Sequence, residues 1–306
     1  MAGDHRVQCA DPAVRAALLG WLGGAGLAWP GQVSLAVELV DTLPESGDAR
    51  EDFTQPELRI QSGPPDDTVR VRWTGGPAEA LVHPTAASAR LWLTPGALDD
   101  FERAERGFLL VVLLVGLRRL GWYHVHCAAL RDPTGQGWMF VGQSNSGKST
   151  TSALLARSGW SVATDDIGFL TDSHGAVAVA GYRSPIALRA GGRDLLQASD
   201  GMEFARRGKT GYDADALGGS WVSTVAPDVI VFPTVDAQAK TALVRVTPRE
   251  AVRALIASSV WVLAEATHAQ EHLDRLGQLC AQCRVYSATL GPDLIARPSL
   301  LQELLS

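Results

Sequence analysis

Residues 142–149 of this chain read GQSNSGKS and match the phosphate-loop pattern G-x-x-x-x-G-K-[ST] at every fixed position. In such a loop the glycines let the backbone fold tightly around an anion, and successive N–H groups at a helix start point at it. Lys148 can then meet the outer phosphates of a nucleotide, while the Ser149 hydroxyl can hold Mg²⁺. The pattern therefore predicts a site for a nucleoside triphosphate or a similar polyphosphate. The residues predicted to bind it are Gly142, Gln143, Ser144, Asn145, Ser146, Gly147, Lys148, Ser149 and Thr150.

Two adjacent carboxylates, Asp165 and Asp166, follow this loop after a predicted helix and strand. The helix at residues 149–158 descends about 15 Å at 1.5 Å per residue. The strand at residues 160–164 climbs back about 16 Å at 3.3 Å per residue. Both carboxylates thus return to the level of the loop, where ligands bind in open α/β sheets. Because neighbouring strand residues point to opposite faces, we expect the two acids to have different roles. The alternative is a turn at the strand end with both acids solvated.

A strand predicted at residues 123–130 carries His124 and His126 on one face. The turn sequence DPTGQG at residues 132–137 then leads into the strand that precedes the glycine-rich loop. This hairpin feeds directly into the predicted nucleotide site. One of the two histidines is therefore expected to approach the site, and the alternative for either is a structural role.

These residues together resemble the HPr kinase/phosphorylase-like group, which is similar in turn to the phosphoenolpyruvate carboxykinase nucleotide fold. The resemblance rests on His126-Cys-Ala-Ala, the glycine-rich loop and Thr164-Asp165-Asp166. Further segments that look alike are RSPIALR at residues 183–189 and DVIVFP at residues 228–233, so that it covers about residues 121–300. It implies an ATP-dependent kinase that phosphorylates a serine hydroxyl, with the first Asp as general base and Mg²⁺ bound nearby.

The chain also departs from that group. Thr150 stands where HPr kinases usually have Glu, and no Glu-Arg-Gly signature follows the two aspartates. In this respect the chain looks closer to divergent kinases of biosynthetic gene clusters, some of which resemble serine kinases that modify lasso peptides. A homo-oligomer is compatible with the resemblance, because HPr kinases assemble as hexamers.

The predicted reaction transfers the γ-phosphoryl group of ATP to a hydroxyl, in the first place a serine of a peptide or small protein. The loop backbone and Lys148 would hold the β- and γ-phosphates, and Ser149 with Asp166 would hold Mg²⁺. Asp165 would accept the hydroxyl proton, with His126 close enough to tune or share it. ATP and Mg²⁺ are thus the expected cofactors.

A compact basic segment lies downstream in an otherwise acidic chain. It contains Arg206, Arg207 and Lys209 between glycines, and Arg183 precedes it. Loops with Arg or Lys that close over a transferring phosphoryl group stabilise its charge, so these residues are candidates for a substrate or phosphate loop. The alternative is a solvated surface turn.

Two other function classes use the same residues. A small-molecule kinase would act on a free amino acid, sugar or antibiotic with the same machinery in a narrower pocket. A nucleotide-dependent switch protein would hydrolyse ATP slowly and phosphorylate no acceptor. The paired aspartates favour transfer chemistry, since a pure binding protein needs no base near the γ-phosphate.

The composition of the 306 residues excludes several classes. The net charge of −6 and the lack of a dense Lys/Arg cluster argue against a nucleic-acid partner. The longest uncharged apolar run, residues 108–117, is half a membrane span, so we expect no membrane partner. The first residues lack a signal-peptide pattern, which favours a cytoplasmic chain.

The elements that position the site fall into two expected domains. Residues 1–105 predict a small β-rich domain, with a helix at 12–27 and strands at 32–40, 58–61, 69–73 and 89–93. A helix at about residues 99–120 would lead into an α/β catalytic domain at residues 106–306, with the HPr kinase-like phosphate-loop fold. Later in the chain, Thr247-Pro248-Arg249-Glu250 is a capping box that predicts a helix start.

Overall fold

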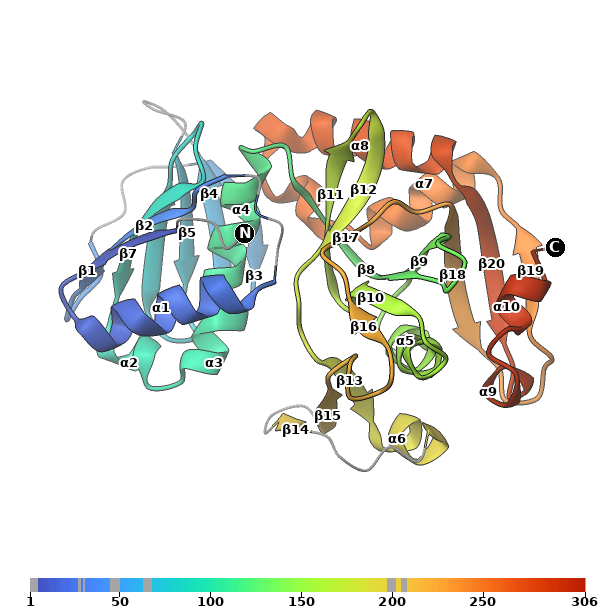
Figure 1. Ribbon diagram of the computed structural model, residues 1–306. Coiled ribbons are helices and arrows are strands. Elements are labelled where there is room, and N and C mark those ends of the chain that lie inside the picture. Colours follow the sequence, from blue (N-terminus) through green and yellow to red (C-terminus); the bar gives the residue numbers. More distant parts are fainter. Residues whose placement is uncertain are drawn as a thin grey trace. The chain divides into compact units, whose positions relative to one another are not determined.

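The computed structural model describes residues 5–26, 29, 31–44, 50–62, 68–196, 202–204 and 208–305. These residues form helices and several sheets, which confirms the α/β class predicted from the sequence. The chain divides into two compact units (Figure 1). The first unit comprises Met1–Tyr123 and Val260–His272, and the second comprises His124–Ser259 and Leu273–Ser306.

A seven-stranded sheet forms the frame of the first unit. Strands β1, β2 and β7 run parallel to one another, and the remaining pairs are antiparallel. Alternate residues such as Val69, Val71 and Trp73 are buried, as expected for a sheet with one face in a core. Across the sheet the order is β1 (Arg6–Cys9), β2 (Ser34–Leu39), β7 (Ser88–Leu93), β6 (Ala78–Val82), β5 (Val69–Trp73), β4 (Leu58–Ser62) and β3 (Arg50–Gln55).

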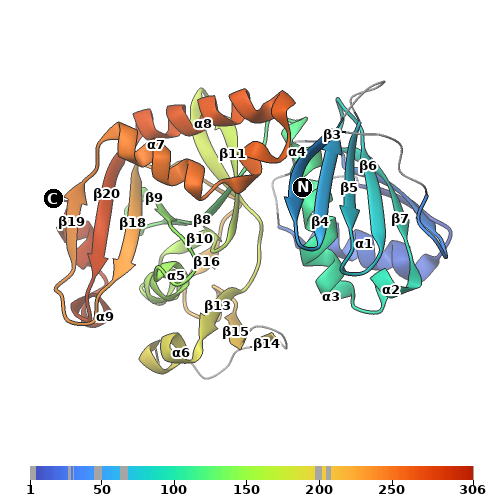
Figure 2. The same cartoon turned by 180° about the vertical axis from the view of Figure 1, so that it is seen from behind.

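Helices α1 (Pro12–Gly24) and α4 (Leu110–Arg118) cover one face of this sheet (Figures 1 and 2). Leu22 of α1, Leu113 of α4 and Leu91 of β7 line a small apolar cavity between the helices and the sheet. Side chains from both helices therefore meet the sheet in one core.

The helix predicted at residues 99–120 is a series of elements: α2 (Pro95–Leu98), α3 (Phe101–Ala104), a π-helical segment (Glu105–Leu109) and α4. In the π-helical segment, a Cβ on Gly107 would stand 3.3 Å from Trp73 Nε1, so this turn lies directly against the sheet. Because α4 packs on β5, β6 and β7, it belongs to the first unit. The division at Tyr123 thus differs from the boundary at residue 105 that the sequence suggested.

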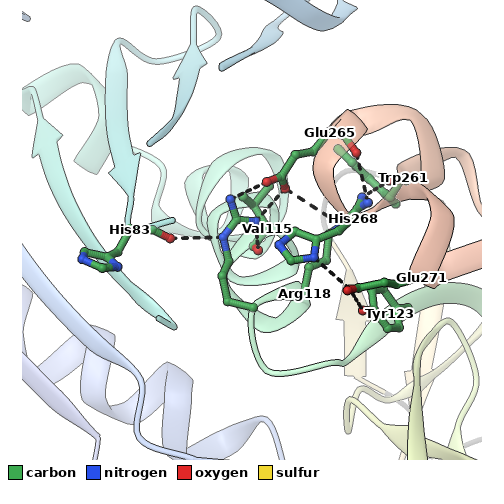
Figure 3. Close-up of polar contacts among 9 residues, drawn as sticks. His83, Val115, Arg118, Tyr123, Trp261, Glu265, His268 and Glu271 are labelled. Carbon is green, nitrogen blue, oxygen red and sulfur yellow. Dashed lines mark hydrogen bonds and ion pairs between the residues drawn. The ribbon is translucent and has the colours of Figure 1, made fainter. Parts of the chain in front are cut away.

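A buried ion cluster fixes the returning segment Val260–His272 to α4 (Figure 3). Arg119 donates two hydrogen bonds to the Glu265 carboxylate, at 2.6 and 2.5 Å. Arg118 donates to the carbonyl oxygens of Trp261 and Glu265. These contacts explain why a segment from late in the sequence is part of the first unit.

The second unit contains a larger sheet that carries the glycine-rich loop. On its main path β9, β18 and β20 run parallel, whereas β19 pairs antiparallel with β20, β8 pairs antiparallel with β9, and β11 pairs antiparallel with β12. Along this path the order is β17 (Thr224–Val225), β12 (Ala176–Gly181), β11 (Ile167–Ser173), β8 (Tyr123–Arg131), β9 (Gly137–Val141), β18 (Val229–Val235), β20 (Arg284–Leu290) and β19 (Ala242–Arg245).

Strand β10 (Ser161–Thr164) lies off this path and brings the two aspartates to the loop. Both β10 and β9 pair antiparallel with β8, so they run in the same direction. The carboxyl ends of β9 and β10 therefore share one edge, as the length argument from the sequence predicts. β10 also pairs in parallel with the short strand β16 (Ser220–Trp221).

Helices and a small sheet complete the second unit. The side chains of Leu154 and Leu155, from α5 (Lys148–Arg157), lie in a core with Trp138, Phe140 and Trp160. A three-stranded sheet has the order β13 (Ile186–Arg189), β15 (Lys209–Tyr212) and β14 (Met202–Phe204). The helices are α5 (Lys148–Arg157), α6 (Ala190–Leu196), α7 (Pro248–Ala257), α8 (Ala269–Gln282, whose first turn is in the first unit), α9 (Asp293–Ala296) and α10 (Leu300–Glu303).

Short 3₁₀ segments at Val260–Ala264 and Ala266–His268 lie between α7 and α8. Within the described part of the chain, no helix has both the length and the apolar character needed to span a bilayer.

Candidate functional site

The glycine-rich loop (residues 142–147) connects the buried strand β9 to helix α5. Two of its residues have left-handed backbones, Asn145 with φ of 70° and Gly147 with φ of 97°. Such turns direct successive N–H groups toward a common concave side, where an anion binds. At Gly142, a Cβ would stand 2.8 Å from the Ser146 Oγ, so a larger residue there would force the Ser146 side chain to move. A strand, a loop and a helix thus follow one another in the order that the sequence pattern requires.

Lys148, the first residue of α5, is folded into this loop. Its ammonium donates hydrogen bonds to the carbonyl oxygens of Gly142 at 2.6 Å and Gln143 at 3.0 Å. The residue is 6% exposed, and burial lowers its pKa while Asp165 and Asp166 act in the opposite direction. The positive charge therefore lies inside the loop, with both acids close enough to affect it.

The turn that carries the two aspartates is fixed by Thr164. Its hydroxyl donates to the Ile167 carbonyl at 2.9 Å and accepts from the Ile167 N–H at 3.1 Å. It also accepts from the Asp166 N–H at 3.3 Å. The backbone at the end of β10 is thereby held, so the two carboxylates start from defined positions.

Asp165 is a buried carboxylate, 3% exposed, beside the start of α5. Burial raises its pKa to about 6, although the Ser149 and Ser152 hydroxyls and the Lys148 charge lower it. Among the described residues, its Oδ1 atom has no hydrogen-bond partner. A buried carboxylate oxygen that accepts no hydrogen bond lowers the stability of the folded protein unless a ligand or cation binds it.

Asp166 is paired with His126, as the sequence allowed for one of the two histidines. His126 Nδ1 lies 3.0 Å from Asp166 Oδ1, and the side chains are 37% and 42% exposed, respectively. Burial alone would raise the pKa of Asp166, but the hydrogen bond and charge of His126 lower it to about 2. The pair is thus an ionised carboxylate with a histidine neighbour, open to a second molecule.

His124 is the inner histidine of this strand. It is buried against Phe169, with ring centroids 6.3 Å apart in an edge-to-face arrangement. Burial lowers its pKa to about 3, so it is neutral near pH 7. Of the two histidines, only His126 is paired with one of the aspartates in the described part of the chain.

The basic residues that the sequence predicted near the phosphates do not all lie at the site. Lys209, on β15, is close enough for its charge to lower the pKa of both Lys148 and Asp166. Arg183 is engaged elsewhere: it pairs with Asp213 at 3.3 Å and its guanidinium lies over the Trp221 ring. The candidates Arg206 and Arg207 lie outside the described residues.

Arg189 is a residue at this site to which the sequence patterns gave no role. Its Nε donates a hydrogen bond to Asn145 Oδ1 of the glycine-rich loop, at 3.2 Å. It is the last residue of β13 and of the segment 183–189 that carries part of the family resemblance. The signal in the sequence that could have indicated Arg189 is its position as the basic residue that ends the segment 183–189, which resembles the HPr kinase group.

The site can accommodate a magnesium ion with nucleotide. The described residues contain no cluster of three or more His, Cys, Asp or Glu side chains arranged to hold a metal. Magnesium in phosphoryl-transfer sites needs no such cluster, because one or two protein oxygens, phosphates and waters supply its six ligands. Asp165 Oδ1 is buried, has no hydrogen-bond partner in the described segments, and lies near the Ser149 hydroxyl, so it fits that role.

No protein-family model matches the chain, and no curated protein matches it. Among solved structures, the chain is similar to the Hpr(Ser) kinase/phosphatase from Coxiella burnetii, with 13% identity and a TM-score of 0.30. The match covers 60% of this chain and 93% of that chain.

Proposed function

We propose that this chain is an ATP-dependent phosphotransferase that transfers the γ-phosphoryl group to an acceptor hydroxyl. The observation that carries the proposal is the meeting of two features at one sheet edge. One is a glycine-rich loop with a buried lysine, and the other is the buried Asp165 carboxylate, whose Oδ1 has no hydrogen-bond partner among the residues that the structure describes. Each suits a bound nucleotide: the loop and Lys148 meet phosphates, and the carboxylate meets the accompanying cation.

The contacts favour Asp165 as the partner of Ser149 in holding Mg²⁺. The Ser149 hydroxyl is close enough to the Asp165 carboxylate to lower its pKa, while Asp166 is paired with His126. This reverses the assignment expected from the family resemblance, in which Asp166 held the metal. When bound, the ion would neutralise charge on the β- and γ-phosphate oxygens.

The Asp166–His126 pair is then the proton acceptor. Both side chains are partly exposed, so an acceptor hydroxyl can reach Asp166. The acceptor oxygen forms a bond to the γ-phosphorus as the bond from that phosphorus to the β,γ-bridging oxygen breaks, and ADP leaves. The hydroxyl proton passes to the Asp166 carboxylate, and His126 holds that carboxylate in place through Nδ1.

The acceptor we favour is a serine hydroxyl in a peptide or small protein. The motif resemblance supports serine, and the exposure of the Asp166–His126 pair suits an acceptor attached to a chain. A small-molecule hydroxyl would use the same groups. A nucleotide-dependent switch is less well supported, because such a protein does not need an ionised carboxylate and histidine beside the transferring phosphate.

Labelled ATP with a set of acceptors tests this function. The set contains serine peptides, the same peptides with alanine in place of serine, free serine and sugars. We expect label on the serine peptides and none on their alanine versions. Label on free serine or a sugar alone would establish a small-molecule kinase. Slow ATP hydrolysis with no labelled product for any acceptor would reject the transferase and favour the switch.

A further inference from the structure

Arg189 is attached to the glycine-rich loop by a residue of the loop itself. Its Nε donates to Asn145 Oδ1, at 3.2 Å, although the two residues are 44 positions apart in the sequence. Asn145 has a left-handed φ of 70°, a conformation that Asn adopts more readily than most residues. The guanidinium of this exposed arginine therefore lies beside the part of the loop that would bind phosphate.

The backbone around Arg189 is anchored to helix α5. Leu188, the preceding residue, is 1% exposed and lies in the same core as Leu155. On the other side, a Cβ on Gly192 would stand 3.0 Å from Thr150 Oγ1 at the start of α5. Both sides of Arg189 are thus tied to the helix that begins the phosphate site, and its side chain is the part that can move.

A second cation lies beside Arg189. Lys209 is its direct partner across the β13–β15 pair, so the two side chains project from the same face of the small sheet. The charge of Lys209 acts on both Lys148 and Asp166. The chain has only three lysines, and two of them, Lys148 and Lys209, are at this site. Positive charge is concentrated here within a protein of net charge −6.

We propose that Arg189 is a ligand of the terminal phosphate of the bound nucleotide, with Lys209 beside it, and that Asn145 holds the guanidinium at the loop until nucleotide binds. The inference rests on the proposed nucleotide site. A guanidinium presents its N–H donors in a planar fork that matches phosphate oxygens in pairs. During transfer, negative charge spreads over the three equatorial oxygens, and a cation outside the loop stabilises it.

Separate calorimetric titrations with Mg·ATP and Mg·ADP test this role. Arg189→Ala is expected to weaken ATP binding by about tenfold to a hundredfold, because charge-assisted hydrogen bonds to the terminal phosphate are lost. The affinity for ADP should stay within about twofold of the wild-type value, since ADP lacks the γ-phosphate. Arg189→Lys should recover part of the ATP affinity, because it keeps the charge but not the paired donors.

Arg245→Ala is the matched control. Arg245 is also an exposed arginine at the end of a strand, but it lies over the Tyr286 ring, 5.5 Å from its centroid. This variant should bind both nucleotides like the wild type. Thermal unfolding of each variant checks that it is folded, and Arg189→Lys carries the test if Arg189→Ala is not.

Unchanged ATP binding in Arg189→Ala, or equal weakening of ATP and ADP, would overturn the role of Arg189 and leave the nucleotide site intact. Failure of the wild type to bind either nucleotide is a different result, which would reject the proposed function itself and the inference with it.

Discussion

Glu265 in the first unit and Asp165 in the second are both carboxylates that are 3% exposed, but their partners differ. Glu265 accepts two hydrogen bonds from Arg119, at 2.6 and 2.5 Å, and lies in a cluster with Arg118 (Figure 3). Asp165 has hydroxyls beside it and a lysine whose ammonium bonds carbonyl oxygens of its own loop. Its Oδ1 has no hydrogen-bond partner in the described part of the chain.

The comparison distinguishes a buried charge that stabilises the fold from a buried charge that a bound ligand would compensate. A carboxylate bonded to buried arginines offsets its own desolvation, and breaking the group leaves uncompensated charge. A buried carboxylate short of partners costs stability in the folded protein, and that cost is tolerated where a bound ion or substrate compensates it. The raised pKa of Asp165, about 6, records this cost. Variants in the two clusters should therefore have opposite effects on stability and activity.

The largest effect is expected at the acid that we assign to proton transfer. Asp166→Asn keeps the shape of the side chain but removes its basicity, so phosphoryl transfer should fall by about 10²–10⁴. Mg²⁺-dependent ATP binding should persist, because Ser149 and Asp165 remain. A transfer assay beside an ATP titration at several Mg²⁺ concentrations measures both. Weakened Mg²⁺-dependent binding, with transfer recovering in part as the Mg²⁺ concentration is raised, would restore the assignment of Asp166 to the metal.

The structural cluster should respond in stability. Glu265→Ala leaves Arg118 and Arg119 buried without their carboxylate, so the free energy of unfolding should drop by about 3–5 kcal/mol. Glu271→Ala is the control, since Glu271 lies on the same returning segment but is 61% exposed, and its loss should cost less than about 1 kcal/mol. Denaturant unfolding curves measure both. Equal losses would mean that burial of the ion cluster is not what stabilises this region.

In the second unit, Lys148→Ala should lower activity, whereas Glu265→Ala in the first unit should lower stability. We expect phosphoryl transfer to fall by about 10²–10³, as for the loss of one preorganised charge that stabilises the transition state. Lys240→Ala, a change at an exposed lysine, is the control and should leave transfer unchanged. Near-normal transfer by a folded Lys148→Ala protein would contradict the nucleotide-site assignment.

Local signals in the sequence predicted much of this architecture. The capping box predicts a helix start at residue 248, and α7 runs from Pro248 to Ala257 with that box formed. The strand predicted at residues 69–73 is β5. Both predictions succeed because the residues that decide them are neighbours in sequence.

What the sequence could not supply depends on distant pairs. Strand β6 reads AEALV, which favours a helix by propensity, yet it is a strand because β5 and β7 pair on either side. The Glu79 side chain in β6 is buried with Arg70 and Arg72, an arrangement that only the strand register creates. The same holds for the Arg189–Asn145 contact.

The roles that we propose for the two acids do not follow from the sequence, for a related reason. Alternation on a strand predicts that Asp165 and Asp166 point different ways, but not which one meets Ser149. That choice is made by the turn around Thr164 and by the packing of β10 on β8.

The pH dependence of stability should expose the cost at Asp165. Its pKa is about 6 in the folded protein against 3.8 for an unperturbed aspartate, so between about pH 4 and 6 the folded state binds more protons than the unfolded state. The contribution of Asp165 to the free energy of unfolding therefore falls as the pH rises through this window, by about 3 kcal/mol at most. Asp165→Asn removes this loss. Unfolding free energies of the two proteins at pH 4.5 and pH 7.5 should show the variant gaining on the wild type at the higher pH.

The most direct test of the account is the unfolding free energy of wild type and Asp165→Asn at pH 7.5, each with and without Mg·ATP. Without ligand, the variant should be the more stable protein, because a buried charge short of partners has been removed. Mg·ATP should stabilise the wild type, by about 2.7 kcal/mol at a hundredfold excess over its Kd, and stabilise the variant much less. A variant that is less stable than the wild type without ligand, or that gains equally from Mg·ATP, would contradict the claim that Asp165 is kept buried for the nucleotide-bound metal.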